Sequence, residues 1–562
     1  MKGIQYDHAA QRKTFVGYVY QEGANKLKED ILNSIHETHA KLHKEGRIHI
    51  HDLEGYGQTY NCLTPDFLRK FPFEEFKTFN DVKKILETFS YYRQIIVNLG
   101  IEQTGGIGFA NFDRDISVIF NRLSISLTPN NSLLLEESID SFMHWLNSSR
   151  DRCGQVQYYV SLNIGLSTSK VGRFVSTTVL SKFITSDYIR PNIIFKVKSG
   201  INFKPNDPNY DLFSLSLEST AKKMIPTYLL CDSPHNMSIH PTEIGIMGCR
   251  TKVVQNEFGK QTSIGRGNIV YSTINLPRIA LEIKTEFPNL SNEGGISLFK
   301  ERWTQVADKV KDLLLDRYNQ LLKLELDDFP CNATKDLWNV DFTSLDDVFK
   351  NGTLSIGFIG LSETIELLTG EKYYNSQEDH EVAIALIKFM RERIDAFREE
   401  FNLNFTLLAT SGEYISGRFP AIDRTFFSNS VLDKNFYTNS FHIEVNSRLN
   451  PFDKLKFEGP FHRLCNGGCI SYIEFRSAPL KNTEAIHELI EYAIQQDINY
   501  LGFNYPLDQC LECGSTGTYD ICPDCGSANI KRIRRVSGYL EELEFFTSGK
   551  KAEVSYRTPN NE

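Results

Sequence analysis

The stretch Arg535-Val536-Ser537-Gly538-Tyr539-Leu540 lies near the end of the chain and directly follows two cysteine pairs. These pairs are Cys510-Leu-Glu-Cys513 and Cys522-Pro-Asp-Cys525, with residues 514–521 between them. Two CxxC pairs at such a spacing strongly indicate a four-thiolate metal site, most often for zinc. A glycine before an aromatic residue is a weak signal by itself, because it usually marks a turn. Whether Gly538 has a chemical role therefore depends on the rest of the chain.

The composition places the chain among ordinary globular proteins. Its 562 residues are 41% hydrophobic and 24% charged, with a formal net charge of −9. The negative charge argues against broad binding to nucleic acid or to an anionic membrane. The sequence has no run of about 18 apolar residues and no signal-peptide layout at its start, so we expect a cytoplasmic protein with no membrane or nucleic-acid partner. Eleven cysteines without a secretory signal are not expected to form a disulfide framework.

Helical and strand-like segments alternate over most of the sequence. The apolar spacing predicts helices over 22–45, which would end at Gly46, over 296–328 and over 379–402. Strand-like runs occur at 155–169, 192–198, 270–276, 354–361, 404–409, 440–445 and 469–475. This alternation favours an α/β architecture with largely parallel strands. The polar residues 548–562 are expected to form a loosely ordered tail.

Cys249 is a candidate reactive thiol. It lies in the segment Gly245-Ile-Met-Gly-Cys-Arg250, between stretches punctuated by glycine and proline, and the adjacent arginine favours the thiolate form. The competing interpretation is a packed core cysteine, because free cysteine is among the most buried residue types. The residues of this segment alone leave both interpretations open.

Two other segments also have two interpretations. His49 and His51 alternate along a strand-like run and could bind a metal, but a strand with polar residues on one face is the favoured interpretation. The segment 103–113 is rich in glycine, yet it lacks the lysine of a phosphate-binding P-loop and does not fit GxGxxG. We interpret it as a close backbone approach beside an active site.

Together these motifs resemble the anaerobic (class III) ribonucleotide reductases, which are glycyl-radical enzymes. The resemblance rests on the cysteine pairs before Arg535–Leu540, on the Cys249 segment, on Thr273-Ile-Asn-Leu-Pro-Arg-Ile279 and on Ile356-Gly-Phe-Ile-Gly-Leu-Ser-Glu363. It spans roughly residues 47–540, with the motifs in family order.

The resemblance implies a ten-stranded α/β barrel with helices outside. The implied domains are a catalytic barrel with an N-terminal helical segment over 1–505, a zinc ribbon over 506–530, and a glycyl-radical loop with the C-terminal tail over 531–562. The ATP-binding cone found in many members is not expected in this chain.

The resemblance also implies roles for individual residues. Gly538 would store a radical, Cys249 would become the thiyl radical that starts catalysis, and Asn275 would be an active-site asparagine. Asn268 occupies another plausible motif position for that asparagine. Other members of the implied active site are Cys62 and Met247, which belong to the formate-using branch. The implied ligands of a structural zinc ion are Cys510, Cys513, Cys522 and Cys525.

The segment Leu408–Phe419 resembles the family's substrate-phosphate loop. The implied substrate-binding residues are Thr410, Ser411, Gly412, Glu413, Ser416 and Arg418. This chain has Ser-Gly-Glu where the family usually has Pro-Ala-Glu, and a turn followed by a solvated arginine is an equally weighted interpretation. Further along, Cys469 stands where the family has a histidine, so no role is assigned to Cys465 or Cys469.

The implied activity is the anaerobic reduction of ribonucleoside triphosphates to 2′-deoxyribonucleoside triphosphates for DNA synthesis, with formate as reductant. A partner activase that uses S-adenosylmethionine and an iron–sulfur cluster would install the radical on Gly538. Glycine suits radical storage, because a Cα radical without a side chain can lie flat and delocalise into both neighbouring amides. A homodimer that binds nucleoside triphosphate effectors at an interface specificity site is a further family expectation.

The nearest alternative is another glycyl-radical enzyme, of the pyruvate formate-lyase type. Such enzymes typically carry adjacent or differently framed cysteines and no CxxC pairs before the glycine. The basic run Lys531–Arg535 beside the ribbon would also suit a zinc-ribbon protein that binds nucleic acid. The third alternative is a paralogue without activity that uses the ribbon as a scaffold, and the intact Gly538 and Cys249 argue against it.

Overall fold

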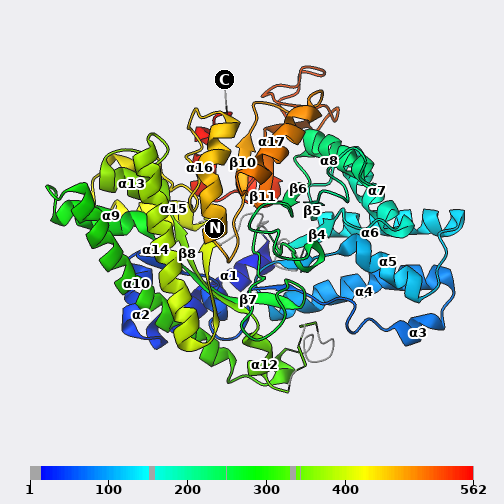
Figure 1. Cartoon of the computed structure of the whole chain (residues 1–562), viewed down its shortest axis with the longest axis horizontal. Coiled ribbons are helices and arrows are strands. Elements are labelled where there is room, and N and C mark those ends of the chain that lie inside the picture. Colours follow the sequence, from blue (N-terminus) through cyan, green and yellow to red (C-terminus); the bar gives the residue numbers. More distant parts are fainter. Residues whose placement is uncertain are drawn as a thin grey trace.

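One large sheet organises the chain (Figure 1). The computed structural model describes residues 14–150, 159–248, 250–329, 337–338, 340–341 and 343–560. The strands of the large sheet are β1 (Ile48–Ile50), β2 (Cys62–Thr64), β3 (Ile107–Phe109), β4 (Val160–Ile164), β5 (Asn192–Val197), β6 (Thr227–Leu230), β7 (Arg266–Asn275), β8 (Thr353–Ile359), β9 (Asn404–Ala409), β10 (Ser471–Glu474) and β11 (Tyr500–Asn504). Their order is β10–β11–β6–β5–β4–β3–β2–β7–β8–β9, and β1 pairs with β7.

The sheet consists of parallel groups of strands that meet in antiparallel fashion. Strands β2 to β6 run parallel to one another, as do β7 to β9 and the pair β10–β11. The pairs β2–β7 and β6–β11 are antiparallel. Between β9 and β10, Gly468 bridges Leu408, and its carbonyl accepts a hydrogen bond of 3.2 Å from the amide of Ala409. This contact joins the two ends of the strand order, which confirms the predicted ten-stranded α/β barrel.

Helices cover the outside of the barrel. They are α1 (Phe15–Ser34), α2 (Glu37–Lys44), α3 (Phe73–Lys77), α4 (Asp81–Glu102), α5 (Phe112–Arg122), α6 (Pro129–Ser148), α7 (Lys170–Thr185), α8 (Tyr210–Lys223), α9 (Leu276–Glu286), α10 (Asn292–Leu321), α12 (Leu345–Phe349), α13 (Leu361–Thr369), α14 (Gln377–Phe401), α15 (Ile415–Asp423), α16 (Pro451–Leu464), α17 (Thr483–Gln495) and α18 (Ser548–Tyr556). Helices α4 to α7 lie on one side, and α9, α10, α13 and α14 lie on the other (Figure 1). Strands such as β8 are buried along their whole length, because parallel strands are covered on both faces.

Two predicted elements differ from the structure in the barrel. The helix expected over 22–45 is split into α1 and α2, because Ile35 adopts an extended backbone after α1. His36 then caps the start of α2 by accepting a hydrogen bond of 3.2 Å from the amide of Thr38. The strand expected at 440–445 does not form in those residues, which the structure describes as turns and irregular backbone.

The helix α18 replaces the loose tail that was expected for residues 548–562. Its buried Lys550 forms an ion pair of 2.5 Å with the buried Glu553. Gly549 lies so close to α15 that an added Cβ would be 2.5 Å from the amide nitrogen of Gly417. This polar segment is therefore ordered, because its charges are paired and its glycine permits close contact.

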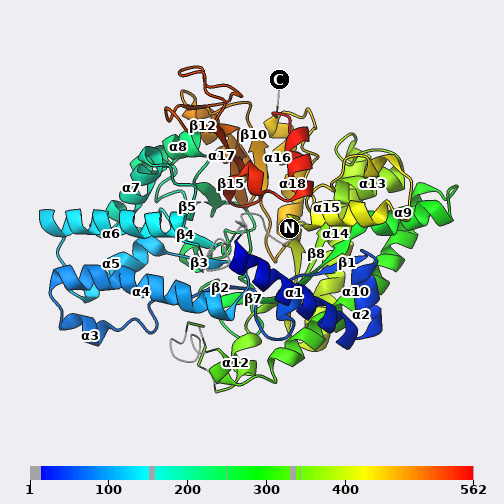
Figure 2. The same cartoon turned by 180° about the vertical axis from the view of Figure 1, so that it is seen from behind.

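The C-terminal region also forms a second sheet, of four strands. They are β12 (Leu507–Cys510), β13 (Thr516–Gly517), β14 (Ile530–Arg535) and β15 (Leu540–Glu542), in the order β13–β12–β14–β15. Strand β14 pairs with β12 on one side and β15 on the other, so the cysteine pairs and Gly538 belong to one sheet. This sheet lies at the same end of the molecule as α17 and α18 (Figure 2). None of the helices in the described ranges is long and apolar enough to cross a membrane.

Candidate active site

Gly538 lies in a buried turn between β14 and β15. The turn closes where the amide of Val536 donates to the carbonyl of Tyr539 at 3.0 Å. The buried guanidinium of Arg535 donates to the Gly538 carbonyl at 3.3 Å and to Oδ1 of Asn504 at 2.7 Å. Since Asn504 belongs to the barrel strand β11, Arg535 attaches the base of the turn to the barrel.

The tip of the turn contacts the loop between β9 and α15. The carboxylate of Glu413 accepts hydrogen bonds from the Ser537 hydroxyl at 3.0 Å and from the Tyr539 hydroxyl at 2.8 Å. The ring of Tyr539 lies 5.0 Å from the ring of Tyr159, measured between centroids. Burial and the charge of Glu413 hold the pKa of the Tyr539 hydroxyl well above its usual value, so this hydroxyl remains protonated and donates. The residues on both sides of Gly538 are thus bound to one carboxylate.

A cavity brings many of the predicted residues together. Its walls come from β2, β7, the residues around 247–251, the loop after β9 and the Gly538 turn. The predicted residues that line it are Cys62, Met247, Thr410, Ser411 and Glu413. Cys249 lies outside the described residues, while Gly248 and Arg250 on either side of it line the cavity.

The glycine-rich segment 103–113 allows the backbone to approach closely beside this cavity, as predicted. An added Cβ on Gly106 would lie 2.4 Å from the Cα of Gly248. An added Cβ on Gly108 would lie 2.7 Å from the carbonyl oxygen of Ile246. Any side chain at these two positions would therefore displace the backbone that leads into the Cys249 segment.

Cys62 and Met247 meet at one wall of the cavity. Cys62 pairs with Asn268 across β2 and β7, and its thiol donates to Oδ1 of Asn61 at 2.8 Å. The Cys62 sulfur also accepts a hydrogen bond of 3.2 Å from the amide of Gly106. Met247 is completely buried and packs with Cys62 in a small apolar cluster. The two sulfur-containing residues that the resemblance implied are therefore neighbours.

Of the two candidate asparagines, Asn268 lines the cavity and Asn275 does not. The Asn268 amide donates to Oδ1 of Asn61 at 3.3 Å, and its own Oδ1 accepts a hydrogen bond of 2.7 Å from Ser355. Asn275 lies at the far end of the same strand. Seven residues of extended strand span about 23 Å, so the two asparagines lie in different parts of the protein.

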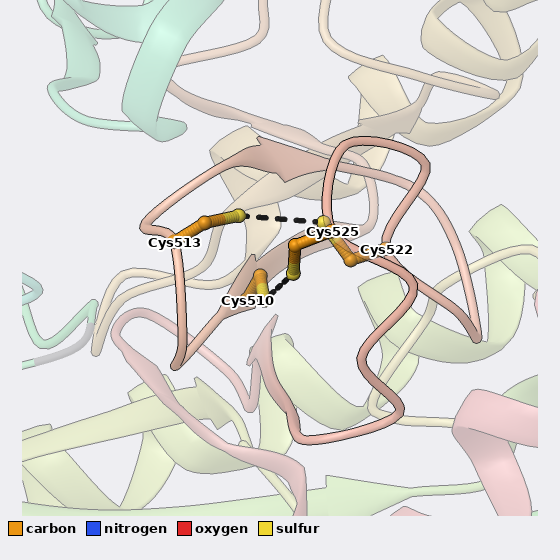
Figure 3. A group of neighbouring side chains, drawn as sticks. All are labelled: Cys510, Cys513, Cys522 and Cys525. Atoms are coloured by element: carbon orange, nitrogen blue, oxygen red, sulfur yellow. Dashed lines mark hydrogen bonds between the residues drawn. The ribbon is translucent and has the colours of Figure 1, made fainter.

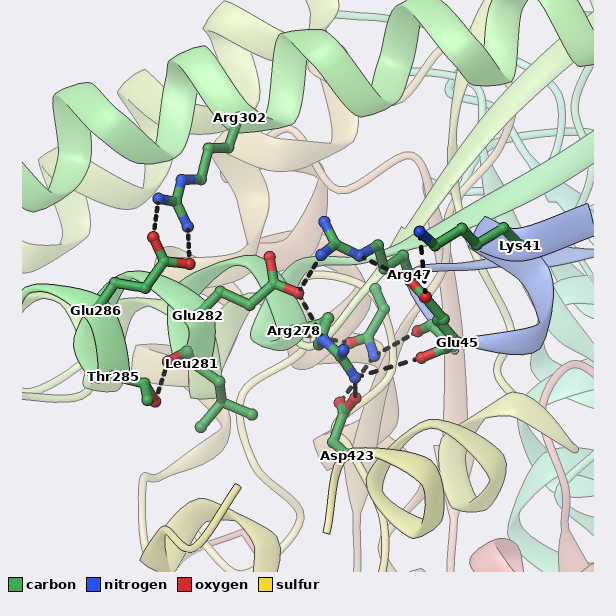
Figure 4. Close-up of polar contacts among 12 residues, drawn as sticks. Lys41, Glu45, Arg47, Arg278, Leu281, Glu282, Thr285, Glu286, Arg302 and Asp423 are labelled. Carbon is green, nitrogen blue, oxygen red and sulfur yellow. Dashed lines mark hydrogen bonds and ion pairs between the residues drawn. The ribbon is translucent and has the colours of Figure 1, made fainter. Parts of the chain in front are cut away.

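Asn275 caps helix α9. Its Oδ1 accepts a hydrogen bond of 3.3 Å from the amide of Arg278, and its Nδ2 donates to Asp423 and to the Gly46 carbonyl, both at 2.9 Å. Arg278 in turn forms ion pairs with Asp423 at 3.0 Å and with Glu282 at 2.7 Å (Figure 4). Asn275 therefore belongs to the polar network that fixes the start of α9.

The predicted phosphate loop is divided between the cavity and the scaffold. Thr410, Ser411 and Glu413 line the cavity, as given above, while the other three predicted residues make contacts elsewhere. The amide of Gly412 donates to Asn439 at 3.0 Å, and the Ser416 hydroxyl donates to the Glu413 carbonyl at 3.1 Å. Arg418 donates to the carbonyl of His43.

Several cavity residues were not singled out from the sequence as site residues. They are His51, Asn61, Tyr159, Arg250 and Tyr271. His51 stacks on Tyr271 with ring centroids 4.0 Å apart, and its Nε2 is 2.8 Å from the Thr273 hydroxyl. The alternation of His49 and His51 was a usable signal, but it was assigned to a strand with a polar face.

The four C-terminal cysteines form a cluster that fits a metal ion (Figure 3). Their sulfur atoms all lie within 4.8 Å of one another. Two sulfur pairs, Cys510–Cys525 and Cys513–Cys522, are 3.5 Å apart, close to the spacing of about 3.8 Å in a tetrahedral zinc–thiolate site. Each CxxC turn ends in a glycine with positive φ, Gly514 at 78° and Gly526 at 73°. Both CxxC pairs therefore form the same kind of turn, which the local sequence specifies through the glycine that follows each pair.

Cys465 and Cys469 are buried away from the cavity. The Cys469 sulfur lies 3.4 Å from Nδ1 of His462. Burial raises the pKa of the Cys469 thiol to about 12, so it stays protonated. These thiols therefore belong to the packed core.

Comparison with known proteins places the chain in one family. Residues 8–559 match the family model for anaerobic ribonucleoside-triphosphate reductase. The relative from Escherichia coli is 31% identical over 97% of this chain and 81% of its own length. The relative from Enterobacteria phage T4 is 28% identical over 92% of this chain and 90% of its own. The structure of the Thermotoga maritima anaerobic ribonucleotide reductase with dATP in the specificity site has a TM-score of 0.68 at 16% identity, covering 95% of this chain and 90% of that one.

Proposed function

The chain belongs to the anaerobic ribonucleoside-triphosphate reductase family, and from this premise we propose that it reduces ribonucleoside triphosphates to 2′-deoxyribonucleoside triphosphates by glycyl and thiyl radical chemistry. The observation that carries the proposal is the buried Gly538 turn, whose Tyr539 lines the same cavity as Cys62, Gly248 and Arg250. A pyruvate formate-lyase type of enzyme is not favoured, because the reductase family model matches nearly the whole chain.

In this proposal Gly538 stores the radical and Cys249 uses it. Both neighbours of Cys249 line the cavity that the Gly538 turn borders, which suits a transfer between the two residues. The Cys249 thiyl radical removes the hydrogen atom from C3′ of the ribose, and the 2′-hydroxyl then leaves as water. A sulfur atom suits this step, because S–H and activated C–H bonds are close enough in strength for reversible transfer.

Formate is the proposed reductant. Formic acid and the ribonucleotide together yield the deoxyribonucleotide, water and carbon dioxide, so formate supplies both electrons. Cys62, Met247 and Asn268 offer a thiol, a thioether and an amide at the wall where formate would bind. We propose Asn268 for the role first given to Asn275, because Asn268 lines the cavity.

The substrate would bind across the same cavity. Thr410 and Ser411 offer hydroxyl groups, and Arg250 offers a cation, which suits a nucleotide phosphate. Gly412, Ser416 and Arg418 would support this loop through the contacts described above. Nucleoside triphosphate effectors at a specificity site of a homodimer are proposed by analogy with the Thermotoga maritima enzyme, whose structure holds dATP in that site.

The cysteine cluster is proposed to hold a structural zinc ion. Four thiolates leave no open coordination position, so the ion would rigidify the sheet and not take part in the reaction. Strand β14 connects this cluster to the Gly538 turn. The radical itself would be installed by a partner activase that uses S-adenosylmethionine and an iron–sulfur cluster.

The proposal is tested by anaerobic activation of three proteins. The wild type, incubated with an activase, S-adenosylmethionine and a reductant, should give a doublet EPR signal and form deoxynucleotides when formate is present. Gly538→Ala should give neither. Cys249→Ser should keep the EPR signal and form no deoxynucleotide, since the stored radical then has no thiol to oxidise. Turnover by Cys249→Ser would contradict the thiyl role.

A further inference from the structure

We propose that Glu413 is a positioning residue that latches the Gly538 turn in its closed, buried state. The inference rests on the proposed radical role of Gly538 and adds a means of controlling access to it. The observation behind it is that the residues immediately before and after Gly538 both donate a hydroxyl hydrogen bond to one carboxylate. That carboxylate lies 124 and 126 residues away in the sequence, on the barrel side of the contact.

The base of the turn is attached to the rest of the protein by contacts that do not involve Glu413. At the base, Arg535 binds Asn504 and the carbonyl of Met224, and Glu541 forms a buried ion pair with Arg190. Within the turn, Arg535 also donates to the Gly538 carbonyl at 3.3 Å, and the Tyr539 hydroxyl interacts with Tyr159. The tip can therefore swing away from the cavity while Asn504, Met224 and Arg190 hold the base, provided that the two hydrogen bonds to Glu413 break together with these two contacts.

An opening of this kind is required by the proposed chemistry. Gly538 is buried, so another protein can reach its Cα hydrogen atom only when the turn leaves its closed position. Transfer to the Cys249 segment requires the closed position, because the turn then borders the cavity. Each hydrogen bond to a buried carboxylate shifts the closed-to-open ratio by about tenfold or more. The strength of the latch therefore sets the balance between activation and turnover.

Glu413 is better suited to this role than to binding phosphate. A carboxylate repels a phosphate group, and both of its oxygen atoms already accept hydrogen bonds from the turn. The same loop presents Thr410 and Ser411 to the cavity. The latch and the proposed substrate contacts thus lie on one short segment.

The first test measures access to the turn in the protein without a radical. Hydrogen exchange of the backbone, followed by mass spectrometry, is compared among the wild type, Glu413→Gln, Ser537→Ala and Tyr539→Phe. We expect the peptide that covers 536–540 to exchange about tenfold faster or more in Glu413→Gln, and to a smaller extent in the two single-donor variants. The peptide that covers β8 should exchange at the wild-type rate in all of them.

Tyr188→Phe is the matched control. It removes a tyrosine hydroxyl that donates to the carboxylate of Asp140 at 2.8 Å, the same kind of bond as Tyr539 to Glu413. This bond joins α6 to the segment after α7 and involves neither Glu413 nor residues 536–539, so the 536–540 peptide should exchange as in the wild type. Unchanged exchange of this peptide in all three latch variants would overturn the proposal.

The second test uses activation and turnover, which the latch moves in opposite directions. In Glu413→Gln the activase should install the radical faster, and oxygen should cleave the activated chain at Gly538 faster. Deoxynucleotide formed per radical should fall, since the turn spends less time closed. A variant that is merely damaged would lower both rates, and that result would also count against the latch. If the wild type never forms a radical, the proposed function is refuted. The hydrogen-exchange comparison of the first test would still show whether Glu413 holds the turn closed.

Discussion

The two asparagines of β7 have the same chemistry and serve different purposes. Asn268 faces the cavity beside Cys62, and Asn275 supports the start of α9 through Arg278 and Asp423. The cysteines divide in the same way, because Cys62 lines the cavity while Cys469 is buried away from it. At the residue scale, position in the barrel and not residue type decides which side chains take part in the reaction.

Alanine substitutions separate the roles of the two asparagines. Asn275→Ala removes a helix cap and two further hydrogen bonds, so it should lower the free energy of unfolding by about 1–3 kcal/mol and keep the deoxynucleotide yield per radical. Asn268→Ala should lower that yield about tenfold or more with the radical content unchanged. Urea unfolding, EPR spin counting and product analysis provide the three readouts. An equal loss of yield in both variants would contradict this division.

At the element scale, the C-terminal strands and α18 surround the active-site loop. The hydroxyl of Thr547, which precedes α18, donates to the Glu413 carbonyl at 2.8 Å. The helix then packs on α15 through Gly549 and Gly417. Asn439 connects α18 to the loop before α15. Its side-chain amide donates to Glu553 of α18 at 3.4 Å, and its side-chain oxygen accepts a hydrogen bond from the amide of Gly412 in the loop. The helix therefore helps to position the loop that carries the latch.

Gly549→Ala tests this packing. Its new methyl group would lie 2.5 Å from the Gly417 amide nitrogen, so the variant should lose about 1–3 kcal/mol of stability and release α18 to proteolysis. Gly23→Ala is the control, because Gly23 lies in α1 with no atom within 4 Å of an added Cβ. That change should stabilise the protein by about 0.5–1 kcal/mol, since alanine favours a helix. Wild-type proteolysis of α18 in Gly549→Ala would argue against the tight contact.

At the scale of the whole molecule, Gly468 closes the barrel. It joins β9 to the segment before β10, and it also bridges Thr251 next to the Cys249 segment. Its φ of 124° is a backbone conformation that glycine adopts readily and other residues rarely adopt. An added Cβ would also lie 2.4 Å from the carbonyl oxygen of Arg250. Barrel closure and the placement of the reactive segment therefore depend on the same residue.

Gly468→Ala should consequently affect stability and activity together. Gly370→Ala is the matched control, because Gly370 has a φ of 91° and no atom within 4 Å of an added Cβ. The control carries backbone strain of about 1–2 kcal/mol. Gly468→Ala should exceed it by about 1–3 kcal/mol, because it also displaces the backbone of residues 250–252. Equal unfolding free energies for the two variants would show that the closure tolerates a side chain.

Features that depend on short spacing could be predicted from the amino-acid sequence. The CxxC pairs define the cysteine cluster, because each pair and its following glycine form one tight turn. Apolar periodicity located α10, α14 and most barrel strands, since burial on one or both faces leaves a regular pattern. The barrel itself followed from the resemblance that these motifs carry.

Contacts between residues that are distant in sequence became evident from the folded structure alone. Nothing local to Asn268 or Asn275 reveals which end of β7 borders the cavity, and nothing local to the polar tail predicts that α18 packs on Gly417. The contact of Glu413 with Ser537 and Tyr539 spans more than a hundred residues of sequence. Such contacts arise from the closure of the barrel and the packing of the C-terminal sheet against it, which no short-range pattern encodes.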